Sequence, residues 1–304
     1  MSRFKIKYII IVLLFVGILF YIYERICVFQ PFDIVVNEYA FMNDSYLKME
    51  EKLAEDGAYI QTTFSKCRIL TLEHQTPLYI VRGNYNNIYN NKSTRIQVKE
   101  DADKIYLRVS PVKDKYDAVF MFISEFPDTV IITNKDYYQD LYLVNFSGNI
   151  NTPVLIINDA TAVVNSDISK LNVFVNNGIF SFYEYCLIDD DIDISELQLK
   201  VCMIDSRFFL ETFLSDSIMV DIKSKKSWFD ISVQCDYIKN FSITGDVRTQ
   251  TKGEKNSVIS FTSKRDTLMC DSLNIEIEND EYLDLVFSDS MIVKNGNILR
   301  SDLK

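Results

Sequence analysis

The chain has 304 residues, of which 48% are hydrophobic, and it carries a formal net charge of -11 at pH 7. This hydrophobic content supports a sizeable core and excludes a disordered chain, while the acidic surplus disfavours a nucleic-acid partner, which would require clustered lysine and arginine. Glycine and proline number only 8 and 5, against 18 tyrosines and 21 phenylalanines, so the composition predicts strands rather than linkers.

The N-terminus contains an apolar segment. Residues 8–23 carry no charge, and Arg3, Lys5 and Lys7 precede them. The run is slightly shorter than the roughly 17 to 25 residues of a spanning helix, and the preceding positive charges place the N-terminus in the cytoplasm. We therefore expect a cytoplasmic tail over residues 1–7 and a transmembrane anchor over residues 8–26 of the cell membrane, with the rest of the chain outside the cytoplasm.

A cleaved signal peptide is an alternative to the anchor, because a basic start followed by an apolar run is typical of both. Large residues fill the positions after the run, including Tyr23 and Ile26, where a signal peptidase requires small ones. A soluble cytoplasmic start is the third possibility.

One helix is expected after the anchor, in a juxtamembrane segment over residues 27–66. Between Asn43 and Gly57, apolar residues recur at helical spacing from Tyr46, and Asp44 or Ser45 can cap the N-terminus of the helix.

The pattern then changes to alternating apolar and polar residues, which predicts an all-β domain over residues 67–304. Alternating strands are expected at Arg68–Leu72, Leu78–Arg82, Arg95–Lys99 and Lys104–Val109. Two more continuously apolar strands are expected at Val119–Ile123 and Thr129–Thr133.

A repeated motif indicates how the later strands are arranged. The segment LSDSIMV at Leu214–Val220 returns as FSDSMIV at Phe287–Val293. Further apolar strands begin at Val130, Leu141, Leu155, Leu171, Leu197, Ile218, Phe241, Leu273 and Val286. Turn residues followed by apolar alternation, with no crossover helix, predict a right-handed parallel β-helix or β-solenoid in which Asp and Ser cap recurring corners. The alternative is an antiparallel β-sandwich, whose strands also alternate with polar turns.

Several segments resemble those of a known bacterial family. IVRGNYNNI at Ile80–Ile88 combines an apolar strand, a Gly-Asn turn and an aromatic residue, and RIQVKEDADKIYLRV at Arg95–Val109 gives two strands around an acidic turn. With LNVFVNNGIF and LNIEIEND, these segments resemble the putative autotransporter adhesin family of the head GIN-domain type. The resemblance implies a β-solenoid on the envelope side with an adhesive or structural role, and it supplies no catalytic residues. The chain departs from that family in having few glycines in its coils and an apolar anchor in place of a lipoprotein signal.

An acidic segment is a candidate calcium site. Calcium takes 6 to 8 oxygen ligands, and DDDIDISE offers the carboxylates of Asp189, Asp190, Asp191 and Asp193. The segment lacks the spacing of an EF-hand loop, so a solvated acidic turn is the alternative. We expect no other cofactor.

A candidate binding surface centres on Trp228 and Phe229, with Asp221 and Asp230 nearby in sequence. Exposed aromatic rings are typical sugar contacts, although Trp228 filling the core is the alternative. His74 is the only histidine, and no nucleophile elbow surrounds it, so a surface or strand-end position is expected rather than a catalytic one.

The six cysteines form no C-x-x-C pair, and we expect free thiols. Together these features predict a membrane-anchored cell-envelope module with a non-catalytic binding, adhesin-like or scaffolding role, whose partner is a glycan or an envelope protein. The alternative is a membrane-tethered carbohydrate-active enzyme of β-helix type, in which Asp221, Asp230, Lys223 and Arg207 would share one face.

Overall fold

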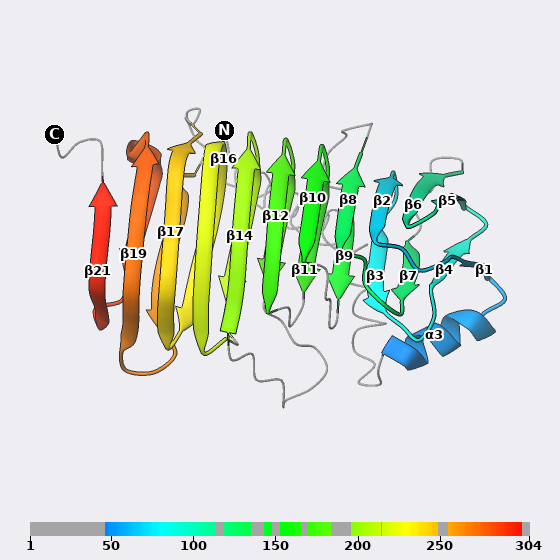
Figure 1. Ribbon diagram of the computed structural model, residues 1–304, viewed down its shortest axis with the longest axis horizontal. Helices are drawn as coiled ribbons and strands as arrows, with labels where there is room; N and C mark the ends of the chain where they lie inside the picture. Colours follow the sequence, from blue (N-terminus) through cyan, green and yellow to red (C-terminus); the bar gives the residue numbers. More distant parts are fainter. Residues whose placement is uncertain are drawn as a thin grey trace, which may run out of the picture. The chain divides into compact units, whose positions relative to one another are not determined.

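The computed structural model describes residues 46–112, 118–134, 143–147, 153–165, 169–183, 196–213, 215–248 and 255–299. These belong to one compact unit, Tyr46–Lys304. In the described ranges the unit is all-β apart from helix α3 (Tyr46–Glu55) and the short helix η2 (Asp280–Tyr282) (Figure 1). The expected helix is confirmed. The transmembrane anchor expected over residues 8–26 lies outside the described residues, and none of the helices within them is long and apolar enough to cross a membrane.

The strands form two ladders, sheet A and sheet B. Sheet B contains β2 (Ile69–His74), β5 (Thr94–Asp101), β6 (Lys104–Pro111), β8 (Thr129–Thr133), β10 (Val154–Asn158), β12 (Lys170–Asn176), β14 (Glu196–Ile204), the first part of β16 (Ser217–Cys235), β17 (Tyr237–Val247), β19 (Leu268–Glu278) and β21 (Met291–Leu299). Sheet A contains β1 (Tyr59–Thr63), β3 (Leu78–Arg82), β4 (Asn87–Asn91), β7 (Val119–Ile123), β9 (Leu143–Ser147), β11 (Thr161–Asn165), β13 (Ile179–Tyr183), β15 (Arg207–Thr212), the second part of β16, β18 (Ser257–Ser263) and β20 (Leu283–Phe287).

From β8 onward the chain visits the two sheets alternately, and from β10 onward every new strand pairs in parallel with the strand one pass earlier. Sheet B grows in the order β8, β10, β12, β14, β16, β17, β19 and β21, as Figure 1 shows. Sheet A grows in the order β9, β11, β13, β15, β16, β18 and β20.

The early strands depart from this order. Strand β2 lies between β6 and β8, and β3 lies between β7 and β9, so the pass that comes first in sequence is not the first in the stack. Antiparallel pairs β1–β4, β4–β7 and β5–β6 complete this end. The sheets are therefore mixed, and neither the wholly parallel helix nor the wholly antiparallel sandwich expected from the sequence describes the entire unit.

Side chains alternate between a shared core and the two outer faces. In β14, Leu197, Leu199, Val201 and Met203 are at most 2% exposed, whereas the residues between them are half-buried or exposed. One continuous hydrophobic cluster contains the inward residues of both sheets. Ile218 belongs to it and Met291 packs against it, so both copies of the repeated motif contribute to one core.

The two copies are not in equivalent register. Through the ladder, Ser217 aligns with Tyr237, Met269 and Ile292, rather than with Ser290. The offset of two residues preserves which side chains face inward, because strand side chains alternate with a period of two.

Corners from sheet B to sheet A share a backbone conformation that disfavours most side chains. Left-handed φ values of 47° to 61° occur at Asp159, Asn177, Asp205, Lys226 and Asn279. Asp and Asn tolerate this region best after glycine, which explains their recurrence.

Serine hydroxyls satisfy the backbone beside these corners. The Ser206 amide donates to Ser227 Oγ over 3.1 Å, and Ser206 Oγ donates to the Ile204 carbonyl over 2.5 Å. The expected capping by Asp and Ser before the strands of sheet B is confirmed at Ser288, whose Oγ accepts from the Ser290 amide over 3.4 Å. A corner is also expected from Asp271 and Ser272 before Leu273, and this prediction is wrong because both residues lie inside β19.

Helix α3 and β1 belong to the described unit, although the sequence placed its domain boundary at residue 67. Leu53 is 2% exposed, and Asn87 Nδ2 of β4 donates to Glu50 Oε1 over 2.7 Å. Strand β1 pairs with β4. The unit therefore begins at Tyr46.

Candidate functional site

Four residues were expected to form a binding surface, and the structure divides them. Trp228 and Asp230 lie on the outer face of sheet A, while Phe229 between them is fully buried in the core. Asp221 belongs to the sheet B part of β16. The corner at Lys226 separates the two parts, so Trp228 and Asp230 share a surface that Phe229 and Asp221 do not reach.

Trp228 lies neither in the core, the alternative considered from the sequence, nor fully in solvent. Its ring centroid is 5.2 Å from that of Phe209, with the planes inclined by 59°. The indole Nε1 donates to the Lys255 carbonyl over 3.0 Å. One edge of the indole is therefore held by the backbone, which leaves a half-buried ring in a defined orientation.

Charged side chains flank this pair of rings. In the register of sheet A, Arg207 lies opposite Trp228, and Phe209 lies opposite Asp230. We call the set Arg207, Phe209, Glu211, Trp228 and Asp230 the aromatic face; its three charged members are exposed and its two rings are half-buried. Such a surface offers apolar planes beside hydrogen-bonding groups.

Sequence reasoning missed Phe209 and Glu211. Phe209 is separated from Trp228 by a whole pass of the chain, and only the parallel register brings the two rings together. The alternation of RFFLET does show that one phenylalanine faces outward, but not what it contacts.

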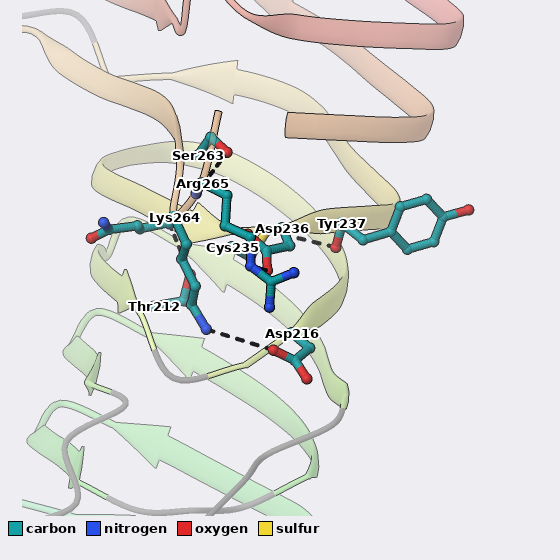
Figure 2. A network of polar contacts seen from close by, with 9 residues as sticks. Thr212, Asp216, Cys235, Asp236, Tyr237, Ser263, Lys264 and Arg265 are labelled. Carbon is teal, nitrogen blue, oxygen red and sulfur yellow. Dashed lines mark hydrogen bonds and ion pairs between the residues drawn. The ribbon is translucent and has the colours of Figure 1, made fainter. Parts of the chain in front are cut away.

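A network of polar contacts joins three corners on the way from sheet A to sheet B (Figure 2). Arg265 Nε lies 3.1 Å from Asp236 Oδ2, and Lys264 Nζ lies 4.0 Å from Asp216 Oδ1. The second Asp236 oxygen is buried without a hydrogen-bond partner. These contacts cross-link successive passes, and we assign them to stabilisation.

A ladder of alternating charge runs over the outer face of sheet B. Lys239 Nζ donates to Glu196, Lys294 Nζ lies 2.7 Å from Asp271 Oδ1, and the Tyr237 hydroxyl also donates to Asp271. These hydrogen bonds lower the pKa of the Asp271 and Glu196 carboxyls and raise the pKa of the Lys294 ammonium. Lys239 lies at an irregularity of β17, where it is an extra residue relative to β16.

His74 lies at the end of β2, as expected, but it is completely buried rather than on the surface. Burial lowers the pKa of its imidazole to about 4, from an ordinary value of 6.5. Nδ1 lies 3.3 Å from the Thr76 carbonyl, which it reaches as a donor, and Nε2 has no hydrogen-bond partner.

The neighbouring Glu73 is also buried, with Oε1 3.3 Å from Arg108 Nε and Oε2 accepting from the Tyr106 hydroxyl. Burial raises the pKa of the Tyr106 hydroxyl, and the hydrogen bond to Glu73 raises it further. Glu73 and His74 are therefore two adjacent buried polar residues in β2.

The candidate calcium ligands Asp189, Asp190, Asp191 and Asp193 lie outside the described residues. Within them, no three or more His, Cys, Asp and Glu side chains gather as a metal site would require. The four described cysteines form no disulfide: Cys67, Cys202, Cys235 and Cys270.

No family model matches the chain, and no curated protein matches it. Two solved structures are similar at low identity. One, described as a putative adhesin from Bacteroides fragilis, is 11% identical, with 79% of this chain and 96% of that chain covered and a TM-score of 0.33. The other, described as a putative lipid binding protein from Parabacteroides distasonis, is 10% identical, with 80% and 98% covered and a TM-score of 0.36.

Proposed function

We propose that this protein is a non-catalytic β-solenoid module of the bacterial cell envelope, held at the membrane by residues 8–26, which binds a glycan through the aromatic face. The observation that carries the proposal is the pair Trp228 and Phe209, presented on rigid strands beside exposed Asp230 and Glu211. The parallel passes from β8 to β21 support the solenoid class, whether or not the chain belongs to the head GIN-domain type.

The physical chemistry of this surface suits sugars. Aromatic rings pack against the apolar C–H faces of a pyranose, and carboxylate oxygens accept hydrogen bonds from its hydroxyls. Strands fix both groups before the ligand arrives, which lowers the entropic cost of binding. Arg207 adds a bidentate donor for a sugar carboxylate, so acidic glycans are the first class to test.

The chain provides its own reporter for the test, because it contains a single tryptophan. Excitation at the red edge of the indole absorption band gives fluorescence emission from Trp228 alone. The full-length protein is titrated with neutral and uronate-containing oligosaccharides, and a saturable change in emission is expected.

A variant tests whether the aromatic face is responsible. Phe209→Ala removes the second ring but keeps Trp228 as the reporter. Loss of a contact of about 1.4 kcal/mol should raise the dissociation constant tenfold. Phe174→Ala is the matched control, because Phe174 is 50% exposed on the outer face of sheet B. Equal affinity of the two variants, or no response to any glycan, would contradict the proposal.

The enzyme alternative is weaker because its proposed residues are divided. Arg207 and Asp230 lie on sheet A, whereas Asp221 and Lys223 belong to sheet B. A general acid and its partner carboxylate must flank one scissile bond within about 10 Å, which two opposite faces do not allow.

A further inference from the structure

The last strands of the two ladders leave part of the core uncovered. We call β20 and β21 the C-terminal edge; among the described residues, β20 pairs only with β18 and β21 only with β19. Three core rows end there, at Phe287, Val293 and Ile298, which are 38%, 36% and 36% exposed. One pass earlier the same rows contain Phe261, Cys270 and Ile275, which are 0%, 0% and 1% exposed.

Two outward-facing residues of this edge are apolar as well. Val286 and Ile292 are 51% and 53% exposed. Strand β21 carries one charged residue, Lys294, and β20 carries one, Asp284. Neither strand contains proline, and neither has the charge density that commonly protects an edge.

The opposite end of the ladders differs. Strand β5, which pairs only with β6 among the described strands, carries the exposed charges Arg95, Lys99, Glu100 and Asp101. Charges of both signs along an edge oppose pairing with another strand. In sheet B, a head-to-tail stack would join this charged edge to the apolar C-terminal edge, whereas the far edge of sheet A, β1, carries no charge and exposes Ile60 at 47%. In sheet B the best complement to the C-terminal edge is therefore an identical edge.

Charge at the C-terminal edge is compatible with that arrangement. The ladder of alternating charge ends at Lys294, while the strand on the other sheet carries Asp284 and is followed by exposed Asp289. A two-fold axis along the strands would place β21 of one copy beside β20 of the other. Lys294 of one copy would then lie near Asp284 and Asp289 of the other.

We propose that the C-terminal edge is the interface of a homodimer, in which β20 and β21 of two copies pair edge to edge and join the two cores. The contact is self-complementary and closes after two copies, as a two-fold interface must. It would cover Phe287, Val293 and Ile298 in both copies. Because it lies on the strand edges and not on an outer face, it is independent of the proposed glycan binding.

The experiment is sedimentation velocity of the full-length protein in a neutral detergent, over a hundredfold range of concentration. The monomer mass is 35.4 kDa, and twice that protein mass is expected at the upper concentrations. Val293→Lys with Ile298→Lys places charge in the interface, while in the monomer both ammonium groups can extend into solvent. The double variant should dissociate at least tenfold more readily than wild type.

The control is Phe174→Lys, which introduces one lysine at a 50% exposed apolar residue away from the edge, and it should remain dimeric. Hydrogen exchange of wild-type peptides covering β20 and β21 gives a second readout that needs no variant. Protection of their amides should rise with protein concentration.

Three results would overturn the proposal. A monomer at every concentration is one, and an open series of larger oligomers is another. Protection of β21 that is independent of concentration is the third, because it would show that another segment of the same chain covers the edge. None of these results would affect the glycan titration.

Discussion

His74 should contribute to the destabilisation of this protein by acid. The imidazole is completely buried, and its pKa in the folded state is about 4, compared with 6.5 when exposed. Above pH 6.5 the imidazole is neutral in both states and contributes no pH dependence. As the pH falls below 6.5, the unfolded chain binds a proton that the folded chain does not, so stability is lost down to about pH 4.

The magnitude follows from the difference between the two pKa values. Each pKa unit corresponds to about 1.4 kcal/mol, so the complete loss is about 3 kcal/mol, and about 2 kcal/mol of it is reached at pH 5. This is a large share of the 5 to 15 kcal/mol that stabilises a typical domain.

Urea unfolding from pH 7.5 to pH 4 measures the effect, and His74→Asn isolates it. Asparagine can still donate to the Thr76 carbonyl but does not titrate. Carboxylates such as Asp271, whose pKa is lowered by Lys294 and Tyr237, titrate in both proteins and cancel in the comparison. The free energies of wild type and variant should diverge below pH 6.5. Parallel curves down to pH 4 would refute the assignment of a buried, neutral imidazole.

Three further predictions follow from particular contacts. Phe229→Ala empties a fully buried position and should cost about 3 to 5 kcal/mol in urea unfolding, whereas Trp228→Ala one residue away should cost clearly less; equal losses would contradict the burial pattern of β16. Gly245 has φ of 123°, and an added Cβ would lie 1.8 Å from the Ser224 carbonyl oxygen, so Gly245→Ala should lower the melting temperature by several degrees, and an unchanged melting temperature would exclude that clash. If the acidic segment around Asp190 binds calcium, millimolar calcium should raise the melting temperature of wild type but not of Asp190→Asn, and no rise in wild type would exclude the site.

Some strand positions were predicted well because local alternation or a local apolar run determines them, whereas β1, β11, β15 and β18 were not predicted. Leu78–Arg82, Val119–Ile123 and Thr129–Thr133 coincide with β3, β7 and β8. Alternation indicates which side chains face the core, but it does not indicate which strands are neighbours in the sheet. The insertion of β2 between β6 and β8 depends on the ordering of whole passes, which no local pattern encodes. The contact of Phe209 with Trp228 was missed for the same reason.

Strand β16 shows why nearness in sequence misled the choice of site residues. Asp221 and Trp228 are seven residues apart on one continuous strand. Alternation alone would assign both side chains to faces of a single sheet. The left-handed residue Lys226, with φ of 49°, turns the chain from sheet B to sheet A between them. Each sheet then faces solvent on its own side of the common core. A site on this protein must therefore be assembled along a ladder, from one pass to the next, and not along the chain. Trp228 with Phe209 satisfies that condition, and Trp228 with Asp221 does not.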